Sequence, residues 1–170
     1  NDKGGDFKFK DGDGPAYALH AQTTDKLLIA CDNGRFYTLS ADKLPSARGF
    51  GEPLRSMIDI EAEAQILAVL VFRPGVKLLL ASSAGKGFVA PADELVAETR
   101  KGRAVMTCKP GVTMKVVREV AQGHDQVAVI GDNRKLVVFA LSEMPEMTKG
   151  QGVTLQRYRD GGLSDAKTLR

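Results

Sequence analysis

Lys and Arg side chains recur at two matching places in this sequence, beside glycine or other turn-forming residues. One place follows a tight turn, and the other is a glycine-containing step further along the chain. The residues are Arg35, Lys86, Arg134 and Lys135 after the turns, and Arg48, Arg100, Lys101, Arg103 and Lys149 at the steps, with Arg55 close behind the first step. Cationic side chains beside glycine backbone can neutralise closely spaced phosphates, so these ten residues are candidate DNA contacts.

The charge distribution supports a polyanionic partner. Residues 73–118 hold nine basic and three acidic residues, a formal charge of +6, whereas the whole chain carries +3 and the remainder therefore −3. Clustering of charge matters more than the total for attracting a polyanion. Solvated hairpin tips also favour Lys and Arg, and an acidic protein fits the same patch, so the residues alone leave these alternatives open.

Other motifs lack the spacing that chemistry requires. The segment Ser82–Lys86 ends like a phosphate-binding loop, but Leu80 stands where the first glycine is needed. His20 and His124 are far from each other in sequence, and Asp11–Gly14 lacks the spaced ligands of a calcium loop. We therefore expect no catalytic residue, metal or cofactor in this chain.

Bulk properties fit one soluble domain over residues 1–170. The chain is 43% hydrophobic, enough for a sizeable core. It has no apolar run near the ~20 residues that span a bilayer and no signal peptide, which favours the cytoplasm and no membrane partner. Cys31 and Cys108 lie in strand-like segments without a C-x-x-C spacing, so we expect buried free thiols. The first residue is Asn1, and we expect a piece of a longer subunit.

A repeat of roughly 50 residues positions the candidate cations. The segment 27–37 is echoed at 78–88 and again at 127–137, so repeats begin near residues 27, 78 and 127. A connector and the glycine step follow each echo in the same order. Periods of this length are typical of propellers and related radial arrays.

Within each repeat, short apolar runs bounded by turn residues predict strands. The expected strands include 17–22, 66–72, 114–120 and 135–139. Asp32–Gly34, Ala84–Gly85 and Asp132–Asn133 are matching tight turns. About four strands per repeat predict an all-β, propeller-like array of four-stranded blades. Residues 92–98 can form a helical turn at most, and 60–65 stay ambiguous because Glu and Ala favour helix.

The chain resembles a known family through segments that cover nearly its whole length. They are Thr23–Leu28, Asn33–Leu39, Gly85–Phe88, Lys149–Gln156 and Arg157–Gly162. In order and at blade spacing, they resemble the C-terminal domain of the A subunit of bacterial type IIA topoisomerases, most closely topoisomerase IV.

The resemblance implies a β-pinwheel, a propeller-like ring in which neighbouring blades exchange a strand. It implies a basic outer rim that binds and bends duplex DNA, and no catalytic residue in this domain. DNA cleavage by a tyrosine with magnesium would belong to the core of the enzyme, and ATP hydrolysis to the B subunit. The implied partners are duplex DNA, the B subunit through the rest of the A subunit, and a regulatory protein on the rim, all in the nucleoid-bearing cytoplasm.

One departure bears on which relative this chain is closest to. Gyrase members carry a Gln-Arg-Arg-Gly-Gly-Lys-Gly box, and the nearest strings here are Arg48–Gly51 and Lys149–Gly152. This difference favours the decatenating enzyme, with the equivalent gyrase domain as the alternative. The chain has room for about three blades plus flanking strands, which leaves space for a larger ring in the whole subunit.

Overall fold

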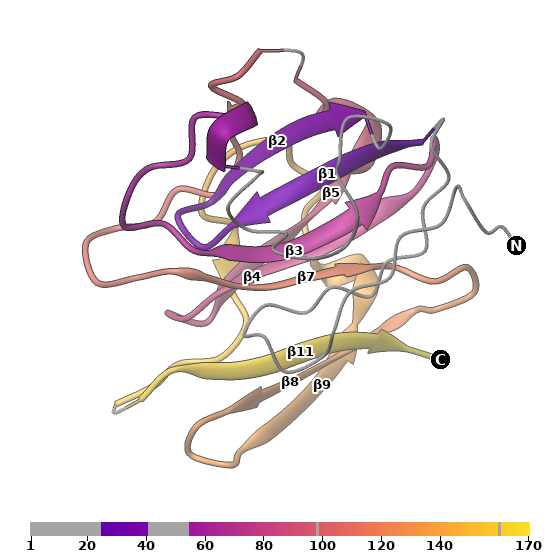
Figure 1. The fold of residues 1–170 in the computed structure, drawn as a ribbon. Helices are drawn as coiled ribbons and strands as arrows, with labels where there is room; N and C mark the ends of the chain where they lie inside the picture. Colours follow the sequence, from indigo (N-terminus) through magenta and orange to yellow (C-terminus); the bar gives the residue numbers. More distant parts are fainter. Residues whose placement is uncertain (1–24, 41–54, 98, 160) are drawn as a thin grey trace, which may run out of the picture.

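The described strands of this protein form three antiparallel sheets (Figure 1). The computed structural model describes residues 25–40, 55–97, 99–159 and 161–170. The strands are β1 (Lys26–Cys31), β2 (Arg35–Ser40), β3 (Ile66–Val71), β4 (Lys77–Ser82), β5 (Lys86–Pro91), β6 (Arg103–Ala104), β7 (Met114–Glu119), β8 (Gln126–Gly131), β9 (Leu136–Ala140), β10 (Val153–Thr154) and β11 (Leu163–Leu169). The strand expected at 17–22 lies outside the described residues.

Each sheet is built around a hairpin with a third strand on one side. The first sheet has the order β3-β1-β2-β6, the second β10-β5-β4-β7 and the third β11-β8-β9. The hairpins share one register, because Ala30 pairs with Phe36, Ala81 with Gly87 and Ile130 with Leu136. The repeat seen in the sequence is thus a repeat of one supersecondary unit.

A strand from each of the last two repeats pairs with the sheet of the repeat before it. β6 comes from the second repeat but pairs with β2 of the first sheet, and β10 comes from the third repeat but pairs with β5. The two pairings match, since Arg35 faces Ala104 and Lys86 faces Thr154. This exchange confirms the all-β pinwheel expected from the sequence.

The third sheet has three strands among the described residues, whereas the repeat predicted four. No described segment pairs with the outer side of β9. Leu136 and Val138 on this strand are 62% and 50% exposed. The equivalent positions Phe36 and Val89 are buried against segments of the next repeat, and no segment in the described part of the chain covers β9 in this way.

Apolar side chains between the sheets form the core. One cluster joins the first and second sheets through residues such as Phe36, Leu80 and Phe88. Another joins the second and third sheets through Leu79 and Val127. β1 and β4 are buried over five of their six residues because other parts of the chain cover both faces. Burial of this apolar surface drives the stacking of the sheets.

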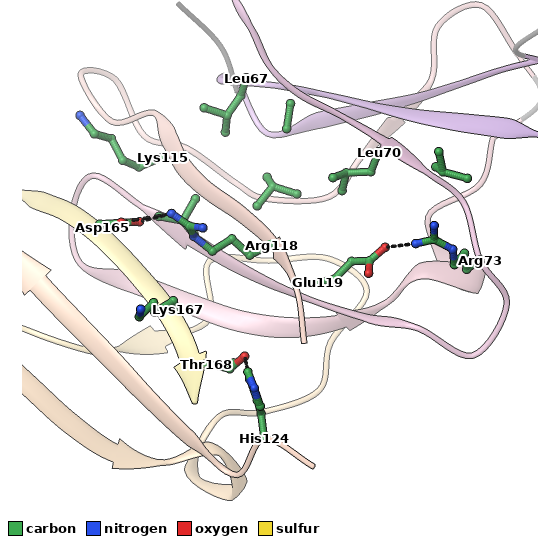
Figure 2. A pocket seen from close by; sticks show the side chains of 14 residues that line it. Leu67, Leu70, Arg73, Lys115, Arg118, Glu119, His124, Asp165, Lys167 and Thr168 are labelled. Carbon is green, nitrogen blue, oxygen red and sulfur yellow. Dashed lines mark hydrogen bonds and ion pairs between the residues drawn. The ribbon is translucent and has the colours of Figure 1, made fainter. Parts of the chain in front are cut away.

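The inner strands β3, β7 and β11 lie side by side and line an open cavity of about 590 Å³ (Figure 2). Two ion pairs cross between them: Arg73 Nη1 lies 3.2 Å from Glu119 Oε2, and Arg118 Nη2 lies 3.1 Å from Asp165 Oδ1. These side chains are about half exposed, so each pair adds little stability but ties neighbouring sheets together. β6 and β10 lie at the opposite, outer edges of their sheets.

The short helical predictions resolve into turns. Ala92–Glu94 form a 3-10 turn, which confirms the expected limit at 92–98. The ambiguous segment 60–65 has a turn at residues 62–63 and no helix. Its end is fixed by Gln65 N, which donates to Asp32 Oδ1 at 3.0 Å. Among the described residues, no helix is long and apolar enough to cross a membrane.

Candidate nucleic-acid interface

Strand exchange brings together cations that are far apart in sequence at the outer edge of the first sheet. Arg35 on β2 faces Ala104 on β6, next to Arg103. Arg35 is half-buried, and its Nε donates to the carbonyl oxygen of Lys101 at 3.2 Å. Arg35 thereby holds the loop that carries Lys101, whose side chain is exposed like that of Arg103.

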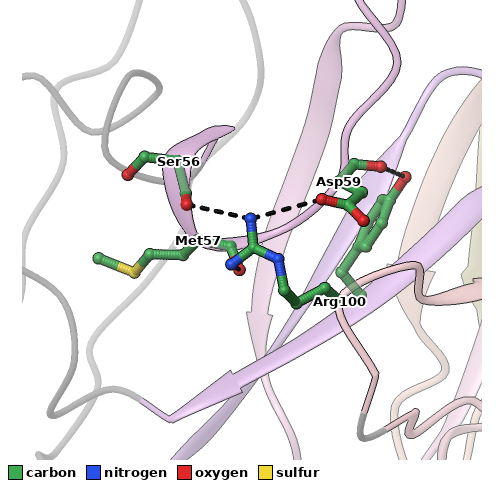
Figure 3. A network of polar contacts seen from close by, with 5 residues as sticks. Ser56, Met57, Asp59 and Arg100 are labelled. Atoms are coloured by element: carbon green, nitrogen blue, oxygen red, sulfur yellow. Dashed lines mark hydrogen bonds and ion pairs between the residues drawn. The ribbon is translucent and has the colours of Figure 1, made fainter.

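Arg100, in the same loop, directs its guanidinium group to the segment 56–59 (Figure 3). Its Nη1 donates to Met57 O at 2.6 Å, and its Nη2 donates to Ser56 O at 3.2 Å and lies 3.4 Å from Asp59 Oδ1. Arg55 likewise donates to the carbonyl oxygens of Glu61 and Ala64. These guanidinium groups shape the loops, a task that the sequence pattern did not reveal.

A second group lies at the edge of the second sheet. Lys86 faces Thr154 across the β5–β10 pair, and Lys149 precedes β10 by a few residues. Gly152 lies close to the carbonyl group of Gly87, an approach that a side chain would prevent. Within the described residues, Lys86, Lys101, Arg103 and Lys149 form no hydrogen bond or ion pair through their side chains. Arg48, the remaining step residue, lies outside the described part.

The third hairpin carries Arg134 and Lys135, both exposed, at its tip. The backbone N–H of Lys135 donates to Asn133 Oδ1 at 2.9 Å, as that of Arg35 does to Asn33. The sequence comparison placed Arg134 after the turn, but it occupies the turn position that Gly34 and Gly85 hold, with φ 67°. Only Lys135 matches the position of Arg35 and Lys86 after the turn, whereas Arg134 lies within the turn; the DNA contact expected of Arg134 stays a prediction.

Two further arginines belong to this surface and were missed as candidates. Arg157 and Arg159 follow β10, and both are exposed. Gln156, their neighbour, donates from Nε2 to Lys135 O at 3.2 Å, which places the segment beside the third hairpin. The alignment of the repeats pairs Arg159 with Lys109 but Arg157 with Thr107, so the sequence offered a signal for Arg159 alone.

The cysteines and His124, which could in principle do other chemistry, have surroundings that fit a role in packing or hydrogen bonding. Both cysteines are free; Cys31 is buried as expected, whereas Cys108 is only half-buried. Burial raises the pKa of the Cys31 thiol to about 12 and also raises the pKa of Cys108. His124 Nδ1 lies 2.8 Å from Thr168 Oγ1. Among the described residues, no group of three or more His, Cys, Asp or Glu side chains is arranged to hold a metal.

The repeated sheets and their exchanged strands correspond to a known family. A sequence model described as "DNA gyrase C-terminal domain, beta-propeller" matches residues 25–73, 77–112 and 125–163. The chain belongs to this family. This assignment confirms the resemblance stated from the sequence. The three matched ranges correspond to the three repeats.

Relatives within the family include A subunits of topoisomerase IV. The protein of this kind from Caulobacter vibrioides is 47% identical over 160 residues, covering 94% of this chain. Its counterpart from Rickettsia bellii is 45% identical over 161 residues, covering 95% of this chain. The matched region is 21% and 22% of these relatives, so the chain spans about a fifth of their length.

Solved structures of the same family share the fold. The C-terminal domain of Escherichia coli ParC superposes with a TM-score of 0.80 at 26% identity, covering 94% of this chain and 71% of that one. A C-terminal domain of gyrase A superposes with a TM-score of 0.69 at 16% identity, covering 95% of this chain and 54% of that one. The pinwheel architecture is therefore shared with both.

Proposed function

We propose that this chain is the DNA-binding and DNA-bending domain of a topoisomerase IV A subunit. It presents duplex DNA to the strand-passage core for decatenation and supercoil relaxation. One observation carries the proposal: strand exchange brings cations of two repeats together at the outer edge of the first sheet, and again at the outer edge of the second. A polyanion that follows these edges meets one group after another.

The chemistry of the groups suits the DNA backbone rather than base edges. Lys101 and Arg103 are exposed and form no polar contact among the described residues, so their charges can replace counterions condensed on phosphates. They lie on loops and on the two-residue strand β6, and no described helix or long strand carries them toward a groove. Contacts of this kind position a duplex without reading its sequence.

The remaining functions of the enzyme are assigned to other parts of the complex. DNA cleavage by a tyrosine with magnesium belongs to the core of the A subunit, and ATP hydrolysis to the B subunit, which this domain meets only through the rest of its own subunit. The domain itself supplies no catalytic group. Its place of action is the cytoplasm, on the chromosome.

The test is fluorescence anisotropy of the protein with labelled duplexes at several salt concentrations. We expect binding that tolerates sequence changes and weakens log-linearly with salt. Replacing Lys101 and Arg103 by Ala should weaken binding and reduce the salt slope by about 0.9 for each phosphate that is no longer neutralised. The matched control replaces Lys115 and Lys167, which line the inner cavity, and should change neither quantity.

Equal losses in the two double variants would show a nonspecific charge effect and contradict the proposed DNA path. No binding at low salt would contradict DNA as the partner and favour an acidic protein on the same surface. Such a protein interface would depend on apolar or aromatic contacts in addition to charge.

A further inference from the structure

The turn glycines of the first two hairpins form the docking site for the exchanged strand. Gly34 O accepts hydrogen bonds from the backbone N–H groups of Val105 and Met106, each at 3.0 Å. Gly85 O accepts the equivalent bonds from Leu155 and Gln156, at 2.6 and 3.3 Å. Each incoming strand is therefore anchored where it leaves the sheet edge.

This docking leaves no room for a side chain on the turn residue. A Cβ atom built on Gly34 would overlap the carbonyl oxygen of Met106, and one on Gly85 would overlap that of Gln156. Both obstacles are backbone atoms of the docked segment, which cannot move without breaking the hydrogen bonds to the glycine. Glycine is required here by the approach of another strand, in addition to its positive φ of 88° and 83°.

The third hairpin has the same turn but a different residue. Arg134 N donates to Gly131 O at 2.9 Å, as Gly34 N does to Cys31 O and Gly85 N to Ser82 O at 3.0 Å. Arg134 keeps the left-handed conformation, with φ 67°, in spite of its side chain. Its Cβ thus occupies the place that the docked backbone fills in the other two hairpins.

We infer that Arg134 ends the strand-exchange array, so that the third sheet receives no strand from another repeat. A positively charged tip is also a common protection of an open sheet edge against pairing. The exposed Leu136 and Val138 on β9 fit this role as a terminal edge. The inference rests on backbone geometry and holds whether or not the rim binds DNA.

Hydrogen exchange in the full-length protein tests the inference at one matched pair of amides. Val89 N donates to Pro145 O at 2.9 Å, outside its own hairpin. Val138 has the same register position on β9, so its N–H points outward as well. We expect Val89 to exchange at least about 1,000-fold more slowly than its urea-unfolded reference, and Val138 within about tenfold of its own reference. Protection of Val138 comparable to that of Val89 would overturn the inference.

A substitution tests the steric cause separately. Gly85→Arg recreates the third turn in the second hairpin and should remove the protection of the amide at Gly87, which pairs with Val153 on β10. Ala84→Arg adds the same charge one residue earlier, at an exposed position, and should leave that protection intact. Unchanged protection in Gly85→Arg would show that a side chain at this turn does not block docking. If Gly85→Arg fails to fold, the comparison of Val89 with Val138 in the unaltered protein still decides.

Discussion

At the scale of single residues, cationic side chains perform two tasks on this surface. Arg35 and Arg100 direct their guanidinium groups to backbone carbonyl oxygens, and Arg100 also to Asp59. Lys101 and Arg103 have no such contacts among the described residues. Arg35 and Arg100 can hold the loop because a planar guanidinium with five donors binds several carbonyl oxygens at once. Lys101 and Arg103 are carried by that loop and by β6, with their side chains exposed. A charge count along the sequence cannot separate these tasks.

Residue burial also sets a dependence of stability on pH. Burial raises the pKa of Cys31 from 9.0 to about 12, so above pH 9 the unfolded chain loses a proton that the folded chain keeps. Stability is then fully present below pH 9 and falls as pH rises toward 12. Between pH 8 and 10.5 we expect a loss on the order of 2 kcal/mol from this group, measured by urea unfolding.

Cys31→Ala should remove most of this loss while lowering stability at both pH values through the smaller side chain. Cys108→Ala is the control, because that thiol is only half-buried. An unchanged difference between the two pH values in Cys31→Ala would assign the effect to other groups, such as Tyr37, whose pKa burial also raises.

At the scale of elements, the long strands were predictable and the exchanged ones were not. Apolar runs such as 66–72 and 114–120 mark β3 and β7 to within one residue, because their periodicity and flanking turns are local signals. β6 and β10 have two residues each, too few to show a period. Their pairing partners lie in another repeat, and their position is decided by turn glycines whose steric role appears only in three dimensions.

The exchanged strands should therefore be sensitive to glycine substitution in a position-dependent way. Gly152 has φ 83°, and a Cβ there would overlap the carbonyl group of Gly87. Gly111 has the same φ but no atom within 4 Å of a Cβ. Ala at 111 should cost about 1 kcal/mol of unfolding free energy from the backbone conformation alone. Ala at 152 should cost about 3 kcal/mol or more, because it also displaces β10.

Urea unfolding of the two variants at neutral pH gives the comparison, since both replacements are chemically the same. Equal losses would mean that β10 tolerates displacement and that the exchange contributes little to stability. A loss confined to Gly152→Ala would identify the junction between the second and third sheets as a principal source of stability.

At the scale of the whole molecule, the inner and outer edges of the sheets have different charge arrangements. Along the inner cavity, Arg73, which follows β3, and Arg118 on β7 are paired with carboxylates of the next sheet. On the outer edges, Lys86, Lys101 and Arg103 have no polar partner among the described residues. The paired arginines tie neighbouring sheets together, and Lys86, Lys101 and Arg103 lie at the outer edges of two sheets that pack on each other, so these edges hold their cations at fixed separations.

Fixed separations predict that both groups bind a single duplex at the same time. Kd for a long duplex should rise in the Lys101→Ala/Arg103→Ala variant and in Lys86→Ala/Lys149→Ala, because each variant removes cations that neutralise phosphates. Energy transfer between dyes at the duplex ends reports bending. It should fall in both double variants even when protein is added until all DNA is bound, since a bend requires contact at both groups. Full bending in a saturated double variant would show that one group suffices, and the rim would then bind DNA without shaping it.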